Sequence, residues 1–141
     1  GVIKSAAGIG GLLLRGIGNT IRVSLTDDPV KEVEAGIKLL KAIGIRNDGI
    51  KLVSCPTCGR TEIDLIGLAK RAEERFASID KDITVAIMGC VVNGPGEASA
   101  ADIGIAGGKD CGVIFKHGKV LYNKVPENEL LDLLEQEINK M

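Results

Sequence analysis

Three cysteines lie in two short segments rich in glycine and proline, and this arrangement could bind a metal. Cys55 and Cys58 form a Cys-x-x-Cys pair, and Cys90 lies in the second segment, which also carries Glu97. Each segment directly follows a stretch that is typical of a β-strand. If the two strands are neighbours, the three thiols and the carboxylate converge on one centre. Three thiolates with an oxygen ligand as the fourth suit a 4Fe–4S cluster in which one iron is easier to open.

The spacing favours a metal of some kind but leaves other chemistry open. Zinc knuckles also use Cys-Pro-x-Cys-Gly segments, although a zinc ribbon usually carries a second Cys-x-x-Cys pair, which this chain lacks. A structural zinc module would use Cys55, Cys58 and Cys90 with Glu97 or Cys111, and would be a folding device rather than an enzyme. A thioredoxin-like redox pair is a weaker alternative. So is a simple electron carrier, because it gains little from an open iron.

The other polar candidates have an ordinary structural interpretation on local evidence. Glu97 by itself is typical of a surface carboxylate after a turn, and Asn93 of a residue within that turn. Cys90 by itself could be a small buried thiol, but its glycine neighbours favour a close backbone approach to a bulky group. Cys111 is expected to be a structural thiol. His117, the single histidine, is expected at a solvated hairpin tip.

Length and composition exclude several classes of protein. The 141 residues suffice for one ordinary domain, or for a small domain with a remnant of another. With 18 basic and 19 acidic residues and 2% aromatics, the chain is expected to bind neither nucleic acid nor a membrane surface. It has no apolar stretch of membrane-spanning length and no recognisable secretory signal, so we expect a soluble, cytoplasmic protein. Because the sequence starts at Gly1 without an initiator methionine, we expect it to be part of a longer chain.

The first part of the chain, residues 1–46, is predicted to be a helix–strand–helix segment. Residues 4–15 are apolar and rich in small side chains, and are expected to form a helix. Residues 21–26 alternate between apolar and polar side chains, which predicts a strand with Arg22 and Ser24 on one face. A solvated edge explains that face on alternation alone, whereas an inward face in a barrel would suit an anionic substrate.

A second helix is expected after this strand. Asp28 and Pro29 have the residue types of an N-cap and a first helical position. The apolar stripe predicted for its buried face is Val30, Val33, Ile37, Leu40 and Ile43. One strand between two helices cannot close a core alone, and the turn over 46–49 is the predicted boundary to the rest of the chain.

The second part, residues 47–141, is predicted to be one sheet with helices packed on it. Strands are expected over 50–53, 83–88, 102–106, 113–115 and 120–122, the last two forming a hairpin. Helices are expected from Thr61 to about Ile79 and from Pro126 towards the end. The resulting order, β-α-β-β-β-β-α, belongs to the α/β or α+β class.

Four segments carry a resemblance to one enzyme family. They are 18–29 (GNTIRVSLTDDP), 54–65 (SCPTCGRTEIDL), 88–98 (MGCVVNGPGEA) and 101–108 (ADIGIAGG). Together they closely resemble the C-terminal part of the 4-hydroxy-3-methylbut-2-enyl diphosphate synthases of the non-mevalonate isoprenoid pathway. The resemblance covers essentially the whole chain, and the two cysteine segments are highly specific to the family.

The resemblance implies a two-part fold and a set of site residues. Residues 1–46 would be the last helix–strand–helix of a TIM barrel, and residues 47–141 an iron–sulfur domain similar to those of sulfite and nitrite reductases. The family's ligands of the 4Fe–4S cluster match Cys55, Cys58, Cys90 and Glu97. Asn93 matches a residue beside the open iron, and Arg22 and Ser24 match residues that contact the substrate diphosphate.

The resemblance also implies a reaction and its partners. Members of the family convert 2-C-methyl-D-erythritol 2,4-cyclodiphosphate to 4-hydroxy-3-methylbut-2-enyl diphosphate by a two-electron reductive ring opening and dehydroxylation. Flavodoxin or ferredoxin donates the electrons, and the carboxylate at the position of Glu97 moves aside for the substrate. The enzymes are homodimers in which one subunit's cluster domain closes over the other's barrel. Because most of the barrel is absent from this chain, we expect it to be inactive alone.

Overall fold

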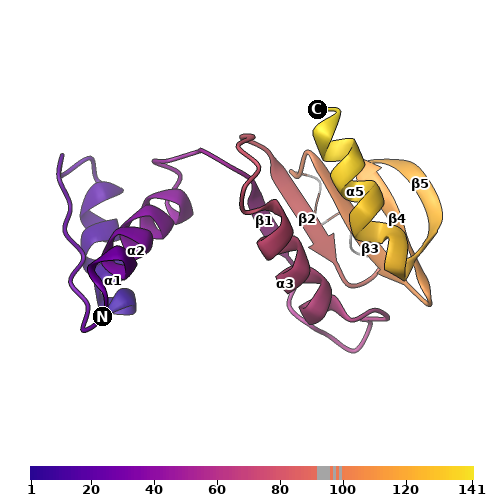
Figure 1. The fold of residues 1–141 in the computed structure, drawn as a ribbon, viewed down its shortest axis with the longest axis horizontal. Helices are drawn as coiled ribbons and strands as arrows, with labels where there is room; N and C mark the ends of the chain where they lie inside the picture. The colour runs from indigo at the N-terminus through magenta and orange to yellow at the C-terminus, as the bar shows by residue number, and fades with distance from the viewer. Residues whose placement is uncertain (92–95, 97, 99) are drawn as a thin grey trace. The chain divides into compact units, whose positions relative to one another are not determined.

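Residues 1–91, 96, 98 and 100–141 are described by a computed structural model of the chain (Figure 1). Asn93 and Glu97, two of the predicted site residues, lie outside the described residues. The chain divides into two units, Gly1–Asp48 and Gly49–Met141. In the part of the chain that is described, no helix combines the length and the apolar character that a bilayer crossing requires.

The first unit contains two helices, α1 (Val2–Leu13) and α2 (Pro29–Ala42). Asp28 caps α2 as predicted, because its Oδ1 accepts a hydrogen bond from the backbone N–H of Val30 at 2.8 Å. The predicted small-residue helix is also confirmed, and it packs on α2 through a glycine. A Cβ added to Gly10 would lie 3.3 Å from Leu39 Cδ1, so the absent side chain permits this close approach.

The apolar stripe predicted for α2 is covered only in its later turns, where Ile37, Leu40 and Ile43 are half-buried. Val30 and Val33 are 61% and 62% exposed, and the buried residues of the helix, Gly36 and Leu39, lie outside the predicted stripe. The contact with α1 is made near Leu39. The first turns of α2 therefore remain uncovered within this unit, and the prediction is wrong for the two valines.

The strand predicted over 21–26 is not formed. The alternation that predicted it is nevertheless present in the burial of the side chains, because Val23 is buried while Arg22 and Ser24 are exposed. A strand requires ladder hydrogen bonds with a neighbouring strand, and the first unit contains no other strand to supply them. The local pattern thus predicted the buried face correctly and the secondary structure wrongly.

The described residues of the second unit form one five-stranded sheet with two helices. Its elements are β1 (Lys51–Ser54), α3 (Leu65–Phe76), β2 (Thr84–Met88), β3 (Ile103–Gly108), β4 (Cys111–Lys116), β5 (Lys119–Pro126), the 3₁₀ helix η1 (Glu127–Glu129) and α5 (Leu130–Asn139). The strands lie in the order β1-β2-β3-β4-β5; β1, β2 and β3 are mutually parallel, and β4 and β5 are antiparallel to their neighbours. The predicted element order and the mixed α/β class are confirmed.

Helices α3 and α5 cover one face of this sheet (Figure 1). Alternate residues of the parallel strands supply that face, among them Ile87 of β2 and Ile105 of β3, both fully buried. The helices contribute the apolar residues Leu65, Leu68, Ala72, Phe76, Leu130, Leu131, Leu134 and Ile138. Their spacing matches the helical period, which places them on the side of each helix that faces the sheet.

The opposite face of the sheet is lined by small residues around one aromatic ring. Phe115 of β4 pairs with Gly104 of β3, which in turn pairs with Ala86 of β2. A Cβ on Gly104 would lie 2.5 Å from Phe115 Cζ, so the ring occupies space that only a glycine leaves open. This fit joins β4 to the parallel strands at the centre of the sheet.

The predicted hairpin of β4 and β5 is confirmed. Its two-residue turn has φ values of 47° at His117 and 74° at Gly118, as a type I′ turn requires. The His117 side chain is 63% exposed, and its Nδ1 lies 4.0 Å from Asp102 Oδ1. This histidine is therefore a solvated turn residue, as expected.

Candidate metal centre

The first and second cysteine segments meet at one edge of the sheet because β1 and β2 are parallel neighbours. Ser54, the last residue of β1, is in register with Ile87 of β2. Cys55 follows β1 directly, and Cys90 follows the end of β2 after one glycine. The carboxyl ends of parallel strands lie at the same edge, so both thiols are delivered to it. The condition for convergence set out from the sequence, that the two strands be neighbours, is therefore met.

A backbone N–H group points at the first of these thiols. The N–H of Gly89 donates a hydrogen bond to Cys55 Sγ at 3.3 Å. Gly89 is buried, whereas Cys55 and Cys90 are half-buried. N–H···S hydrogen bonds orient thiolate ligands and tune the reduction potential of iron–sulfur clusters. The residue before Cys90 thus places a backbone N–H within hydrogen-bond distance of a sulfur in the other segment.

The segment that carries the Cys-x-x-Cys pair, here called the cysteine loop (residues 55–60), is closed by the residue that follows it, Thr61. The backbone N–H of Cys58 donates to Thr61 Oγ1 at 3.2 Å, and the N–H of Thr61 donates to the carbonyl oxygen of Cys58 at 3.0 Å. Cys58 itself is exposed. The backbone that carries this exposed thiol is therefore held by a reciprocal pair of hydrogen bonds.

The fourth cysteine, Cys111, lies at the same edge, as the alternative of a structural zinc module requires. β3 is parallel to β2 and ends at Gly108, and this residue pairs with Cys111 at the start of β4. A two-residue turn with Asp110 at φ 58° makes the connection. Cys111 is half-buried and its thiol is free, like the other three. Only the pairing of β3 with β4 brings it there, and neighbouring residues in the sequence carry no such signal.

The described cysteines fit a thiolate-bound iron–sulfur group in residue type, and the pairing of β1 with β2 brings Cys55 and Cys90 to the same end of the sheet. The thiolates of Cys55, Cys58 and Cys90 would be soft donors, and Cys55 Sγ accepts an N–H···S hydrogen bond. Within residues 1–91, 96, 98 and 100–141, no three side chains of His, Cys, Asp or Glu come close enough to share a metal ion. Ligands of a protein metal site are commonly drawn together only when the metal binds.

The two predicted substrate contacts belong to the first unit. Arg22 and Ser24 are exposed and flank the buried Val23. A Cβ on Gly36 of α2 would lie 3.9 Å from Val23 Cγ2, so this valine faces α2. Because side chains alternate along an extended segment, the guanidinium and the hydroxyl leave from the opposite side. Their role in substrate binding stays a prediction.

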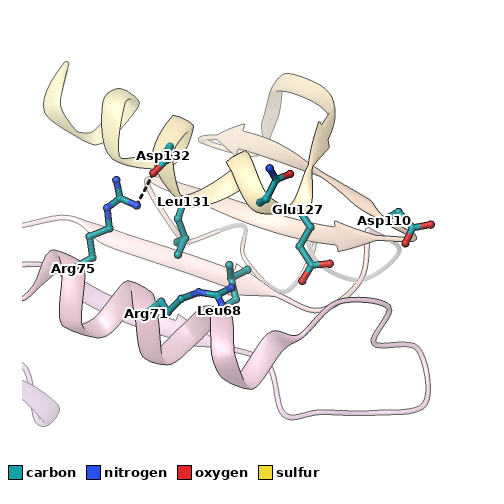
Figure 2. A pocket seen from close by; sticks show the side chains of 8 residues that line it. Leu68, Arg71, Arg75, Asp110, Glu127, Leu131 and Asp132 are labelled. Atoms are coloured by element: carbon teal, nitrogen blue, oxygen red, sulfur yellow. Dashed lines mark ion pairs between the residues drawn. The ribbon is translucent and has the colours of Figure 1, made fainter.

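A cavity between α3 and the start of α5 was not predicted from the sequence (Figure 2). Its volume is about 580 Å³, and it is lined by Leu68, Arg71, Arg75, Asp110, Glu127, Asn128, Leu131 and Asp132. Arg75 Nη1 lies 2.6 Å from Asp132 Oδ1, and the guanidinium also bonds to Glu135. These hydrogen bonds raise the pKa of Arg75 above its ordinary value. The cavity is lined by both basic and acidic side chains, so it has no uniform charge that would select an anion.

Comparison with known proteins assigns the family. A family model described as the GcpE protein C-terminal domain matches residues 51–140, and the GcpE TIM-barrel domain matches residues 1–37. The chain belongs to the GcpE family. The family resemblance of the four segments is thereby confirmed, and so is the assignment of the chain to the C-terminal part of the family's members.

Several curated relatives match along the whole chain. One from Geobacter sulfurreducens is 57% identical over 141 residues, which is 100% of this chain and 40% of the relative. One from Caldanaerobacter subterraneus subsp. tengcongensis is 60% identical over 141 residues, covering 39% of the relative. Both carry the name 4-hydroxy-3-methylbut-2-en-1-yl diphosphate synthase (flavodoxin). The chain thus spans about 40% of the length of these relatives.

Proposed function

We propose that the chain is the cluster-bearing C-terminal part of a 4-hydroxy-3-methylbut-2-enyl diphosphate synthase. The whole enzyme would convert 2-C-methyl-D-erythritol 2,4-cyclodiphosphate to its product by two-electron reductive ring opening and dehydroxylation. Relatives at 52% to 60% identity carry the synthase name. The single structural observation that supports the proposal is the parallel pairing of β1 with β2, which delivers Cys55 and Cys90 to one edge.

The proposed ligands of a 4Fe–4S cluster are Cys55, Cys58, Cys90 and Glu97. When bound, the cluster would supply electrons to the substrate one at a time. Three thiolates hold iron firmly, whereas a carboxylate is harder and exchanges more readily. Glu97 is thus the ligand suited to move aside for the substrate, and Asn93 is proposed to lie beside the position it leaves. The N–H of Gly89, 3.3 Å from Cys55 Sγ, stabilises charge on that sulfur.

Arg22 and Ser24 are the proposed contacts to the substrate diphosphate. The planar guanidinium of Arg22 offers paired N–H donors that match phosphate oxygens, and the Ser24 hydroxyl can donate one more hydrogen bond. Both side chains are exposed on the side of the segment away from α2. Neither is neutralised in the ion pairs recorded among the described residues.

The remaining proposals concern the organisation of the whole enzyme. Residues 1–46 are the proposed last segment of a TIM barrel, and residues 47–141 the proposed cluster domain, with an arrangement similar to sulfite and nitrite reductases. The matches of the two family models on either side of this boundary support that division. We propose a homodimer that works in the cytoplasm and receives electrons from flavodoxin, which the relatives' names include, or from ferredoxin.

The ligand assignment is tested with serine variants of the 141-residue chain, reconstituted anaerobically with iron and sulfide. We expect Cys55→Ser, Cys58→Ser and Cys90→Ser each to lose most of the cluster, because a serine oxygen is a poor ligand for a cluster iron. Cys111→Ser is the matched control at the same edge of the sheet, and it should retain the cluster. Loss of the cluster in Cys111→Ser, with retention in any one of the other three, would overturn the assignment.

The role of Glu97 is tested in the full-length enzyme, where turnover can be measured. Glu97→Ala should lower turnover more than it lowers the iron and sulfide content, because the three thiolates still hold the cluster. Full activity in this variant would rule out the proposed role. The 141-residue chain alone should give no turnover of the cyclic diphosphate, since only a segment of the barrel accompanies the cluster domain.

A further inference from the structure

We propose that Thr61 is a positioning residue that latches the cysteine loop to the end of β2, and so sets Cys55 and Cys58 relative to Cys90. The inference rests on the proposed function, in which these three thiols bind one cluster. Thr61 carries none of the chemistry itself. Its side chain and its backbone both hydrogen-bond to Cys58, and its side chain also packs against Gly89 after the end of β2.

The first half of the latch is within the loop. Thr61 Oγ1 accepts the backbone N–H of Cys58 at 3.2 Å, and the N–H of Thr61 donates to the Cys58 carbonyl oxygen at 3.0 Å. The two bonds close a four-residue ring, which fixes the backbone that carries an exposed thiol. A side-chain hydroxyl that bonds a nearby backbone N–H is a frequent way of ordering such turns.

The second half joins the loop to β2. A Cβ added to Gly89 would lie 3.0 Å from both Cγ2 and Oγ1 of Thr61, so the threonine side chain sits directly against that glycine. The next residue, Glu62, donates its backbone N–H to the carbonyl oxygen of Gly89 at 3.2 Å. The N–H of Gly89 in turn donates to Cys55 Sγ at 3.3 Å. Gly89 therefore contacts the cysteine loop through Cys55 and the residues just after the loop through Thr61 and Glu62. Because Gly89 directly precedes Cys90, these contacts link the first two thiols to the third.

The test measures the latch in the metal-free chain by the alkylation rate of each cysteine, read by peptide mass spectrometry. Thr61→Val keeps the shape of the side chain and removes the hydroxyl that accepts the Cys58 N–H. We expect the half-buried Cys55 to react about fivefold faster in this variant, the factor that corresponds to about 1 kcal/mol, the net contribution of one hydrogen bond. Thr61→Ser keeps the hydroxyl and should restore the rate to nearly that of the wild type.

Two controls accompany these variants. Cys111, half-buried at the same edge but in another hairpin, should react at an unchanged rate in every variant. Thr57→Val changes an exposed threonine of the same loop and should leave Cys55 unaffected. Gly89→Ala presses on Thr61 from the other side, with a second close contact at 3.1 Å from Leu65 Cδ2, and should accelerate Cys55 as Thr61→Val does.

The same variants are then reconstituted, and the loss of visible cluster absorbance in air is followed. Thr61→Val should lose its cluster several-fold faster than Thr61→Ser and the wild type. Equal alkylation of Cys55 in the wild type, Thr61→Val and Gly89→Ala would overturn the latch, whatever the chain binds. If the wild type takes up no iron and sulfide while Cys55 still responds to Thr61, the proposed function fails and the latch stands.

Discussion

A glycine at the centre of the sheet gives the sharpest stability prediction. Gly104 of β3 pairs with Ala86 of β2 and with Phe115 of β4, and the side chains of both neighbours are fully buried. A Cβ at this position would lie 2.5 Å from the carbonyl oxygen of Ala86, 2.5 Å from Phe115 Cζ and 2.9 Å from the Ala86 Cβ. Carbon atoms in contact are normally about 3.5–4.0 Å apart. Gly104→Ala therefore forces the strands or the ring to move.

The loss of stability in Gly104→Ala depends on how far the atoms around the added Cβ can move. Overpacking a core costs about 1–3 kcal/mol, and occasionally more. One of the three contacts is a backbone carbonyl within the β2–β3 ladder, which cannot rotate away as a flexible side chain would. We therefore expect Gly104→Ala to lower the free energy of unfolding by about 3 kcal/mol, which is more than a hundredfold in the unfolding equilibrium at about 1.4 kcal/mol per factor of ten.

Urea unfolding followed by tyrosine fluorescence measures this change. Tyr122 is the only tyrosine and the chain has no tryptophan, so the signal reports on β5 and the second unit. Gly59→Ala is the matched control, because a Cβ there would meet no atom within 4 Å. That control should be unchanged or slightly more stable, since alanine restricts the unfolded chain.

A double variant tests the cause of the loss. Phe115→Leu shortens the ring side chain that occupies the space above Gly104, so Gly104→Ala should cost less in that background than in the wild type. We expect a coupling energy of about 1 kcal/mol or more between the two changes. Recovery will be partial, because the contact with the carbonyl oxygen of Ala86 remains. Equal unfolding midpoints for Gly104→Ala and Gly59→Ala would refute the reasoning.

Two further predictions concern α3 and α5. Asp64 caps α3, with its Oδ1 accepting the N–H of Gly67 at 3.0 Å, so Asp64→Ala should lower the free energy of unfolding by about 1 kcal/mol while Asp64→Asn changes it little. The pKa of Glu137 is lowered because Lys140 and the Tyr122 hydroxyl donate hydrogen bonds to its carboxylate. The ionised carboxylate therefore stabilises the folded chain at neutral pH. This contribution is lost as the pH falls below about 4.3, the ordinary pKa of a glutamate. Lys140→Ala should weaken this acid dependence in urea unfolding measured from pH 7 down to pH 3, and an unchanged pH profile would contradict the assignment.

Secondary structure in the second unit was largely predictable because each strand carries its own signal. The alternation and apolar runs of 83–88 and 102–106 mark strands buried on both faces, and His117-Gly118 marks a tight hairpin. The prediction of a strand over 21–26 is wrong because the local pattern says nothing about a neighbouring strand. Alternation reports which side chains are buried, but a strand also needs a partner, and none lies within the first unit.

The candidate site was predictable in its residues and only partly in its geometry. The spacing of Cys55, Cys58 and Cys90 indicated thiolate ligands, whereas their common edge depends on the pairing of β1 with β2. Cys111 reaches that edge through the register of β3 with β4, which no local pattern encodes. Thr61 was predicted only as the first residue of a helix, because hydrogen bonds that close a loop are set by its three-dimensional path.

The metal content of the purified chain tests the central claim most directly. Iron, acid-labile sulfide and zinc are measured per chain after anaerobic purification, together with a visible absorption spectrum. The account predicts iron and sulfide close to one 4Fe–4S cluster per chain, held by the thiolates of Cys55, Cys58 and Cys90. Stoichiometric zinc on these cysteines, resisting anaerobic reconstitution with iron and sulfide, would contradict it and identify a structural zinc module instead.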